Sequence, residues 1–386
     1  MKKLTHIDCF AGPGGICTGF KAAGIETVLA IEKVESCVET YKANHPNVPV
    51  IQMDIRKVSK SDIAQYWHKD IDIVSSGMPC ETFSTAGNKS RSFYDHRQFL
   101  FAEAIRIAKL VNAKIILFEN VKGITSKKTE KNGTRLIVDE LYDQLSANGY
   151  KYYVDTILDA ADFGVPQYRQ RFFVLATNDP KIELQVPISK RNGMVKVKDA
   201  LKGLPPLEAN EDRIPKHYLP NESDYTKLLK DAKFWRTRRA TSELTYHIAP
   251  KHREGTIKRL SLIRPGEGLK DLFEKYTAAQ REKLRKEKIL PKKWFIQRNR
   301  RLIETEPSVT VTSHCLDELV HPTSNRSLTV REVARLQSFP DAYDFKGGPL
   351  ICPHIYETQD KYEQIGDAVP PLLAYAWGKV IRKVLS

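Results

Sequence analysis

The alternation of short apolar runs with helical patterns over the first 180 residues is the feature that most limits the fold. Seven runs have the composition of strands, and most are separated by helix-like stretches, as in βαβ units with a parallel sheet. Only the last two runs are joined by a non-helical link, which favours an antiparallel pair at the sheet edge. The predicted strands are 5–10, 27–32, 50–54, 71–76, 114–119, 153–158 and 172–177, and the predicted helices include 16–23, 97–111 and 133–147.

The remaining chain divides into two parts. With 386 residues, the chain exceeds what one hydrophobic core usually supports, so we expect two domains or one decorated domain. Regularity stops near Asn178, and the following stretch is rich in Lys, Arg and Pro with weak periodicity. It resumes at LTVREVARLQ, which predicts a capped amphipathic helix, and a last helix is opened by Pro370 and Pro371. We therefore predict an α/β protein with a Rossmann-like sheet domain (1–180), a basic module (181–325) and a C-terminal segment (326–386) that returns to the sheet domain.

Composition argues for an ordered intracellular protein. No stretch approaches the roughly 18 apolar residues of a membrane span, and the amino terminus has no apolar signal core, so we expect neither a membrane partner nor export. The six cysteines include no CxxC pair, which favours reduced thiols in a cytoplasm and no metal site. Cys9, Cys37 and Cys315 are interpreted as small buried hydrophobic residues.

The charge of the chain suggests a polyanionic partner. Lysine and arginine total 62 against 47 acidic residues, a net charge of +15. The segment from Arg281 to Arg301 holds ten of the basic residues and two glutamates, a net +8. Its first part, 281–288, could equally be a solvated helix face. Trp235 and Trp294 lie inside basic runs, where anchoring a core is the preferred interpretation.

Two candidate catalytic groups follow neighbouring strand-like runs. Cys80, in GMPCETFS, comes after the apolar run 71–74, and Glu119 ends the run 114–118. The carboxyl ends of parallel strands are where open α/β sheets bind ligands, so a thiol and a carboxyl would meet at one edge. Pro79 would stiffen the turn that places this thiol as a nucleophile, whereas the structural alternative for Glu119 is a carboxylate paired with an arginine.

A glycine turn follows the first strand. Glycines in AGPGG let the backbone approach a ligand closely. Glu32 lies twenty residues after Gly12, at the end of the second strand, where an acidic side chain can bind ribose hydroxyls. Asp54 ends the third strand and could accept a hydrogen bond from an adenine amino group. Because GPGG is not GxGxxG, the pattern predicts an adenosine-like ligand without a pyrophosphate.

These motifs together resemble the cytosine-5 DNA methyltransferase family, which uses S-adenosylmethionine. Six motifs match in order along nearly the whole chain, and several are rare strings. They are DCFAGPGG (8–15), GMPCETFS (77–84), FENV (118–121), QYRQR (167–171), RSLTVREVARLQSFPD (326–341) and QIGDAVP (364–370). The basic module occupies the place of the family's target recognition domain.

The resemblance implies a role for each matching residue. Cys80 would be the nucleophile, Glu119 would contact the cytosine ring nitrogen 3 and amino group, and Arg171 would hold the carbonyl, with Arg169 and Gln167 supporting. The cofactor would be held by Phe10, Gly12, Gly14, Glu32, Asp54, Ile55, Pro79, Leu100 and Val369. DNA would be contacted by Ser84, Lys89, Arg91, Arg97, Gln167 and Thr310, the first four from a polar loop (81–98) that would act as a flap over DNA.

The chain departs from the family pattern at two places. Glu81 stands where many members carry Gln, and Asp367 replaces the usual Asn of the last motif. We expect Glu81 to tune base flipping and Asp367 to alter local hydrogen bonding. Neither departure removes a catalytic group.

The predicted function is sequence-specific methylation of cytosine carbon 5 in double-stranded DNA, by a monomer belonging to a restriction-modification system with a cognate restriction endonuclease. The alternatives are a cytosine-5 tRNA methyltransferase and a catalytically silent DNA-binding homologue. The large basic module argues against the first, and the complete set of catalytic residues argues against the second. The recognition sequence, the base-reading residues and the base that removes the carbon 5 proton do not follow from the sequence.

Overall fold

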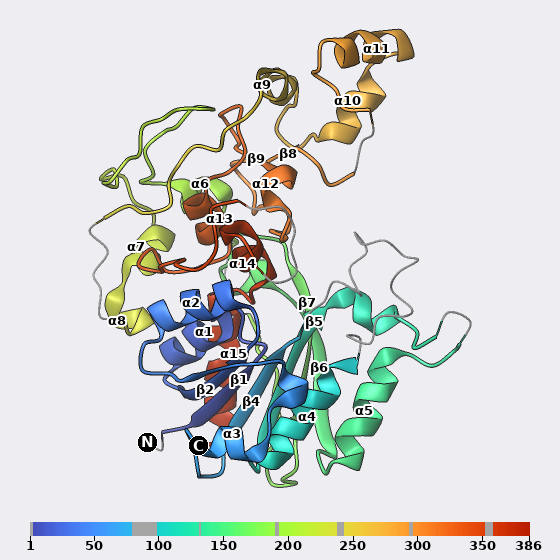
Figure 1. Cartoon of the computed structure of the whole chain (residues 1–386), viewed down its shortest axis with the longest axis vertical. Helices are drawn as coiled ribbons and strands as arrows, with labels where there is room; N and C mark the ends of the chain where they lie inside the picture. The colour runs from blue at the N-terminus through green and yellow to red at the C-terminus, as the bar shows by residue number, and fades with distance from the viewer. Residues whose placement is uncertain are drawn as a thin grey trace.

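A mostly parallel seven-stranded sheet forms the centre of the computed structural model (Figure 1). The structure describes residues 3–78, 99–130, 133–189, 193–237, 243–292, 296–351 and 358–386. The strands of the sheet are β1 (Thr5–Cys9), β2 (Glu26–Glu32), β3 (Val50–Gln52), β4 (Ile73–Gly77), β5 (Ile115–Val121), β6 (Tyr152–Asp159) and β7 (Gln170–Thr177).

The strand order is β3-β2-β1-β4-β5-β7-β6, so the chain crosses over between β3 and β4. Strands β1 to β5 pair in parallel, whereas β7 runs antiparallel to both β5 and β6. The predicted antiparallel edge pair is confirmed, with β6 outermost. The register pairs Gly77 with Glu119, which brings the ends of β4 and β5 side by side.

Helices cover both faces of the sheet, because the strands alternate apolar residues between two cores. One core joins Phe20 of α1 and Trp377 of α15 to Ile73, and the other joins Phe101 of α4 to the next residue of β4, Val74. The helices of this domain are α1 (Gly15–Ala23), α2 (Glu35–Asn44), α3 (Lys60–Ala64), α4 (Phe101–Leu110) and α5 (Ile137–Ala147), with 3₁₀ turns at Ile55–Lys57, Lys122–Ser126 and Ala160–Phe163.

The C-terminal segment packs on the sheet domain through the contact of α15 with α1. It contains α13 (Val330–Leu336), α14 (Lys361–Asp367) and α15 (Pro371–Val384). Helix α15 packs so closely on α1 that a Cβ on Gly19 would lie 2.3 Å from the Pro371 carbonyl oxygen. Thr329 caps α13 as predicted, but the prediction of an amphipathic helix is wrong because all seven residues of α13 are buried.

The middle of the chain forms an extension above the sheet (Figure 1). Its elements are α6 (Val197–Leu201), α7 (Asp224–Lys230), α8 (Ala232–Trp235), α9 (Glu254–Ser261), α10 (Leu269–Lys275), α11 (Ala278–Lys286), β8 (Arg300–Arg301), α12 (Cys315–Glu318) and β9 (Leu319–Val320). A small core of its own includes Leu260, Leu272 and Leu290. Residues from 195 to 235 instead share the core of the C-terminal segment, where Trp235 is buried as predicted.

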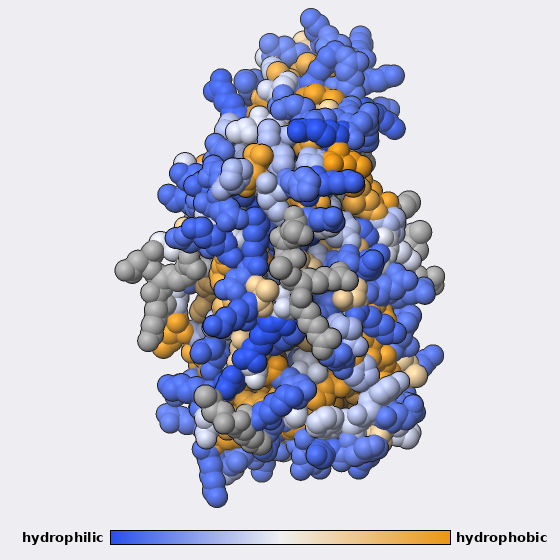
Figure 2. Space-filling view, turned by 90° about the vertical axis from the view of Figure 1, so that its left-hand side faces the viewer, coloured by the Kyte–Doolittle hydropathy of each residue, from blue (hydrophilic) through white to orange (hydrophobic). Residues whose placement is uncertain are grey.

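The surface of this extension is mostly hydrophilic (Figure 2). Helix α11 has no buried residue, which agrees with a solvated helix over this part of the basic run. Among the described residues, no helix is long and apolar enough to cross a membrane.

Candidate active site

The turn after β1 is built for close approach to a ligand. Phe10 and Gly12 both have positive φ values, +57° and +53°, so the backbone reverses sharply here. A Cβ on Gly12 would meet no atom within 4 Å, whereas a Cβ on Gly14 would lie 2.9 Å from His45 Nε2 and from the Tyr343 hydroxyl. Gly12 thus faces open space, and Gly14 is held against the protein.

Glu32, at the end of β2, is fixed by main-chain donors. Its Oε2 accepts the Gly12 N–H at 2.8 Å, and its Oε1 accepts the N–H groups of Lys33 and Val34, both at 2.8 Å. Burial raises the pKa of this carboxyl and the three N–H groups oppose that rise. The carboxylate is therefore held beside the glycine turn, with remaining lone pairs for hydroxyl donors.

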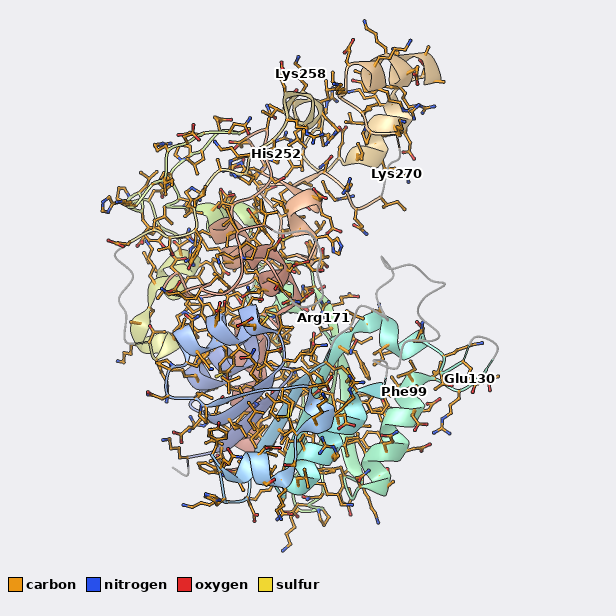
Figure 3. All side chains as sticks on the ribbon, in the orientation of Figure 1. Phe99, Glu130, Arg171, His252, Lys258 and Lys270 are labelled. Atoms are coloured by element: carbon orange, nitrogen blue, oxygen red, sulfur yellow. The ribbon has the colours of Figure 1, made fainter. Side chains whose placement is uncertain are left out.

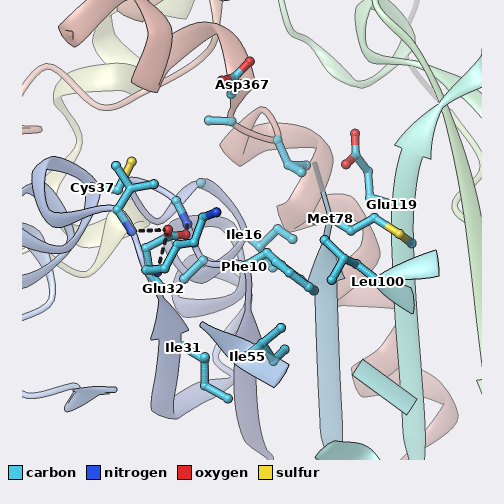
Figure 4. A pocket seen from close by; sticks show the side chains of 18 of the residues that line it. Phe10, Ile16, Ile31, Glu32, Cys37, Ile55, Met78, Leu100, Glu119 and Asp367 are labelled. Carbon is cyan, nitrogen blue, oxygen red and sulfur yellow. Dashed lines mark hydrogen bonds between the residues drawn. The ribbon is translucent and has the colours of Figure 1, made fainter. Parts of the chain in front are cut away.

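These residues line one cavity of about 820 Å³ (Figure 4). Its polar and charged wall includes Glu32, Asp54, Glu119, Arg169, Arg171, Gln359 and Asp367. Its apolar wall includes Phe10, Ile16, Ile31, Ile55, Met78, Leu100 and Val369. The cavity thus gathers Phe10, Gly12, Glu32, Asp54, Ile55, Leu100 and Val369 from the set of expected cofactor residues. Gly14 is absent from the lining, in agreement with its packing against His45 and Tyr343.

Asp54 is engaged by a neighbouring arginine at the cavity wall. Arg56 donates from Nε at 2.9 Å to Oδ1 and from Nη2 at 2.5 Å to Oδ2. The hydrogen bonds from Arg56 lower the pKa of this carboxyl to about 2. Asp54 is therefore anionic at neutral pH, beside the apolar side chain of Ile55.

Glu119 and Arg171 form a buried ion pair at the carboxyl end of β5. Arg171 Nε lies 2.9 Å from Glu119 Oε1, and the two side chains are 10% and 9% exposed. Burial raises the pKa of Glu119, and the charges of Arg171 and Arg169 oppose the rise. The antiparallel β7 brings Arg171 opposite Val121, two residues after Glu119. The site therefore places a carboxyl group of raised pKa beside the guanidinium of Arg171. Both groups can donate hydrogen bonds, so the pair suits a heterocycle that accepts them at two adjacent atoms.

The side chains of Arg169 and Gln167 are buried and bond to main-chain groups inside the protein. Arg169 donates to the carbonyl oxygens of Val311 at 2.5 Å and Gly366 at 2.9 Å. Gln167 is fully buried, donates to Leu336 at 3.1 Å and accepts from the Val311 N–H at 2.8 Å. Because its amide is used inside the fold, Gln167 has no surface for DNA in this structure. A contact between Gln167 and DNA is therefore not part of the function proposed below, and its supporting role stays a prediction.

The other expected DNA-contacting residue in a described segment is Thr310. It is partly exposed and donates to the Tyr168 carbonyl oxygen at 2.7 Å. The expected nucleophile Cys80, together with Pro79, Glu81, Ser84, Lys89, Arg91 and Arg97, lies outside the described residues. Met78, just before them, is buried against the cavity.

Several residues of the site were not expected from the sequence. Cys37 is buried as expected of a small hydrophobic residue, but it also lines the cavity and donates to Gln359 Oε1 at 3.0 Å. Asp8, in β1 and outside the cavity lining, accepts the Ser75 hydroxyl at 2.7 Å, and burial raises its pKa to about 7. Asp8 belongs to a motif that pointed to this turn, whereas no local pattern marks Gln359.

The fold and the cavity define a class of α/β enzymes that work at the carboxyl edge of a mostly parallel sheet. The chain belongs to the C-5 cytosine-specific DNA methylase family, whose model matches residues 4–383. It is therefore a DNA cytosine-5 methyltransferase, which confirms the family prediction made from the six motifs.

Comparison with known proteins agrees along the whole chain. The Type II methyltransferase M.DdeI of Desulfomicrobium norvegicum is 36% identical over 380 residues, covering 97% of this chain and 87% of that protein. The Type II methyltransferase M1.HphI of Haemophilus parahaemolyticus is 31% identical over 383 residues, covering 99% and 87%. A solved E. coli structure described as a prophage DNA modification methyltransferase shares the fold, with a TM-score of 0.73, 24% identity and 99% coverage of both chains. The S. pombe Dnmt2 methyltransferase shares it with a TM-score of 0.60, 17% identity and full coverage of both chains.

Proposed function

We propose that this enzyme methylates carbon 5 of a cytosine that it rotates out of double-stranded DNA, with S-adenosylmethionine as the methyl donor. The Glu119–Arg171 pair at the wall of the cavity beside the glycine turn is the observation that carries this proposal. A base within a duplex cannot reach a buried pair of this kind, so the target must leave the stack.

The cavity fits an adenosine-containing cofactor. The open space above Gly12 leaves room for close approach, and Glu32 would accept hydrogen bonds from ribose hydroxyls. Asp54 would accept from the adenine amino group, while Phe10, Ile55 and Leu100 provide apolar contact. When bound, S-adenosylmethionine supplies an electrophilic methyl group.

The proposed chemistry begins with Cys80, which follows the end of β4. Its thiolate would add to cytosine carbon 6, which makes carbon 5 nucleophilic towards the methyl group. Glu119 would donate a proton or hydrogen bond to ring nitrogen 3, a role favoured by the burial that raises its pKa. Arg171 would stabilise charge on the carbonyl oxygen. Loss of the carbon 5 proton then reforms the double bond and expels the Cys80 thiolate.

DNA would lie between the sheet domain and the basic module. Arg171 lies where the sheet domain faces the module, and Lys258 and Lys270 belong to the module (Figure 3). Basic side chains of residues 181–325 would contact phosphates, and the loop 81–98 would close over the target base. Relatives named Type II methyltransferases support a restriction-modification role, so we also propose a cytoplasmic monomer functionally paired with a cognate endonuclease.

Expression in a host without cytosine methylation, followed by bisulfite mapping of genomic DNA, tests activity, substrate and site together. We expect 5-methylcytosine within one short sequence context. Cys80→Ser should abolish methylation while retaining cofactor binding, and Glu119→Gln should reduce turnover by about a hundredfold or more because a transition-state donor is lost. Competing duplex DNA with tRNA in one assay would overturn the DNA assignment if tRNA were the methylated polymer. Full activity of Cys80→Ser would overturn the covalent mechanism.

A further inference from the structure

The residues that lead into β7 alternate between two environments. Gln167, Arg169 and Arg171 are buried, and both arginines line the cavity of the active site. Tyr168 and Gln170, which alternate with them, are exposed. Successive side chains of an extended chain point to opposite faces, so Tyr168 and Gln170 are turned away from the buried arginines. The exposed face is therefore a surface that neither the cavity nor the core uses.

Lys122 extends this exposed face from the neighbouring strand. It follows Val121, the last residue of β5, which pairs with Arg171 of β7. The Lys122 Nζ donates to Gln170 Oε1 at 3.2 Å, and both side chains are exposed. We call the surface formed by Lys122, Tyr168 and Gln170 the outer patch.

The cation of the outer patch is not neutralised by a neighbouring acid. Within the described part of the chain, Lys122 has no acidic partner, and its hydrogen bond goes to a neutral amide. The acid of β5, Glu119, is already paired with Arg171. Because Gln170 accepts from Lys122 through Oε1, its Nε2 is left to donate to another group. The patch thus offers an ammonium group and an amide N–H side by side, and phosphate oxygens of DNA accept hydrogen bonds from both kinds of donor.

Hydrogen bonds fix the main chain of Tyr168 on both sides. Its N–H donates to the Ser308 carbonyl oxygen at 2.8 Å, and its carbonyl oxygen accepts the Thr310 hydroxyl at 2.7 Å. The side chain is nevertheless 40% exposed, although an aromatic ring gains free energy by burial. An exposed ring on a fixed main chain suits packing against a ligand, because less conformational freedom is lost on binding.

The outer patch lies at the edge of the sheet that carries the Glu119–Arg171 pair. Because β7 runs antiparallel to β5, its first residues lie at the carboxyl end of β5. Arg171, at this edge, lies where the sheet domain faces the basic module (Figure 3). A cytosine in contact with Glu119 and Arg171 stays joined to its own sugar and phosphates. These charged groups would not be buried with the base, so they would lie outside the pair, where the outer patch is exposed.

We propose that the outer patch binds the backbone of the target DNA strand beside the flipped cytosine. Lys122 and Gln170 bind one phosphate, and the ring of Tyr168 packs on the adjoining deoxyribose. This inference rests on the proposed function, because it requires a cytosine held by Glu119 and Arg171. The ends of β5 and β7 then hold both parts of the flipped nucleotide, the base on the buried side and the backbone on the exposed side.

Duplexes with a single methylphosphonate test the phosphate contact, because this group removes the charge of one phosphate and leaves the strand intact. The duplex carries the sequence mapped by bisulfite sequencing, and the phosphates flanking the target cytosine are replaced in turn. We expect one replacement to weaken wild-type binding by about three- to tenfold. Lys122→Gln should bind the unmodified duplex more weakly by a similar factor and should lose the penalty of that replacement.

Lys151→Gln is the matched control for the lysine. Lys151 is exposed and precedes β6, whose first residue pairs with Thr177, the partner of Ile115 at the start of β5. It therefore lies at the opposite edge of the sheet. Lys151→Gln should keep the wild-type affinity and the full methylphosphonate penalty.

Replacement of the ring tests the second contact. Tyr168→Leu should raise the Kd for the unmodified duplex by about threefold or more, whereas Tyr168→Phe, which keeps the ring, should stay near the wild-type value. Tyr152→Leu is the matched control, because this tyrosine is 46% exposed at the start of β6, at the opposite edge of the sheet. It should bind the duplex as the wild type does.

The outcomes separate this inference from the function on which it rests. Lys122→Gln with the same methylphosphonate penalties as the wild type would overturn the phosphate contact, as would a wild type that is indifferent to every replacement. Equal affinities of Tyr168→Leu and the wild type would overturn the contact of Tyr168. In each of these cases, a wild-type enzyme that still methylates the duplex leaves the proposed function standing. A wild-type enzyme that neither binds nor methylates duplex DNA would overturn the proposed function itself.

Discussion

The hydroxyl of Tyr343 donates a hydrogen bond to the main-chain carbonyl oxygen of Pro13, which lies 330 positions earlier in the chain. Pro13 belongs to the turn that shapes the cofactor cavity, and Tyr343 belongs to the C-terminal segment. His45 Nε2 lies 3.4 Å from the same hydroxyl and 3.3 Å from Thr18 Oγ1. Tyr343, His45 and Thr18 therefore form a buried cluster behind the turn. Through this cluster a residue of the C-terminal segment fixes the main chain of the first motif.

Removing this hydroxyl should weaken cofactor binding more than it weakens the fold. Tyr343→Phe is expected to cost about 1 kcal/mol of stability and to raise the cofactor Kd several-fold, because the Pro13 carbonyl loses its donor. Tyr225→Phe is the matched control, since the Tyr225 hydroxyl donates at 2.6 Å to the Arg335 carbonyl, away from the cavity. Calorimetric titration and thermal unfolding of both variants separate the effects. Equal cofactor affinities would show that Tyr343 does not position the turn.

The buried ion pair of Arg335 and Asp341 should be essential for stability. Arg335 Nη2 lies 2.6 Å from Asp341 Oδ2, both side chains are 0% exposed, and Arg335 also donates to the carbonyl oxygens of Ala200 and Lys202. Asp341→Asn would leave a buried guanidinium without its counter-ion, at a cost of about 3–5 kcal/mol in denaturant unfolding. Glu254→Gln, in the exposed pair with Lys258, should cost less than about 1 kcal/mol. Similar costs for both variants would contradict this prediction.

Buried neutral histidines should make the fold sensitive to acid. Burial lowers the pKa values of His6 and His45 from 6.5 to about 3. Below pH 6.5 the unfolded chain takes up protons that these folded side chains exclude, so stability falls as pH drops from 6.5 towards 3. Each histidine contributes up to about 1.4 kcal/mol per pH unit over this window.

Urea unfolding between pH 7 and pH 5 measures this slope. His6→Asn will lower stability at every pH, because the ring nitrogens of His6 contact Thr27 and Ser75. Its stability should nevertheless fall less steeply with acid than that of the wild type. The exposed His217 supplies the control variant, His217→Asn, which should keep the wild-type slope. Parallel slopes for His6→Asn and the wild type would exclude this cause of acid sensitivity.

The lysines of α11 should contribute to DNA affinity through phosphate contacts. Helix α11 buries none of its residues, so Lys283→Gln and Lys286→Gln should not disturb folding. Together they should weaken duplex binding and reduce the slope of log K against log salt by about 0.9 for each lost contact. The control variant is Lys60→Gln, because this exposed lysine is the first residue of α3, which lies at the opposite end of the molecule from α11 (Figure 1). An unchanged salt slope in the α11 variant would place the DNA elsewhere.

The order of strands and motifs along the chain was predictable because local patterns determine it. Each strand-like run of the first 180 residues became a strand, with ends shifted by a few residues. Glycines marked the turn after β1, and Glu32 and Glu119 stood at strand ends, where a parallel sheet must gather them. A resemblance of six motifs then identified the family.

The tertiary structure decided which polar side chains are available to a ligand and which are used in hydrogen bonds to the main chain. The alternating arginines 169 and 171 look equivalent in sequence, yet Arg171 meets Glu119 while Arg169 is used on main-chain carbonyls. Gln167 is buried where it donates to the carbonyl oxygen of Leu336, 169 residues later, and all seven residues of α13 are buried, with α6 and α14 packed against this helix. No local periodicity reports these contacts. The sequence by itself determined the sheet, the turn and the chemical groups at its edge, because strand formation and chain reversal are local. The tertiary structure alone decided the link from Tyr343 to Pro13 and the place of Asp367 in the cavity wall, because both arise only when the C-terminal segment packs on the first turn.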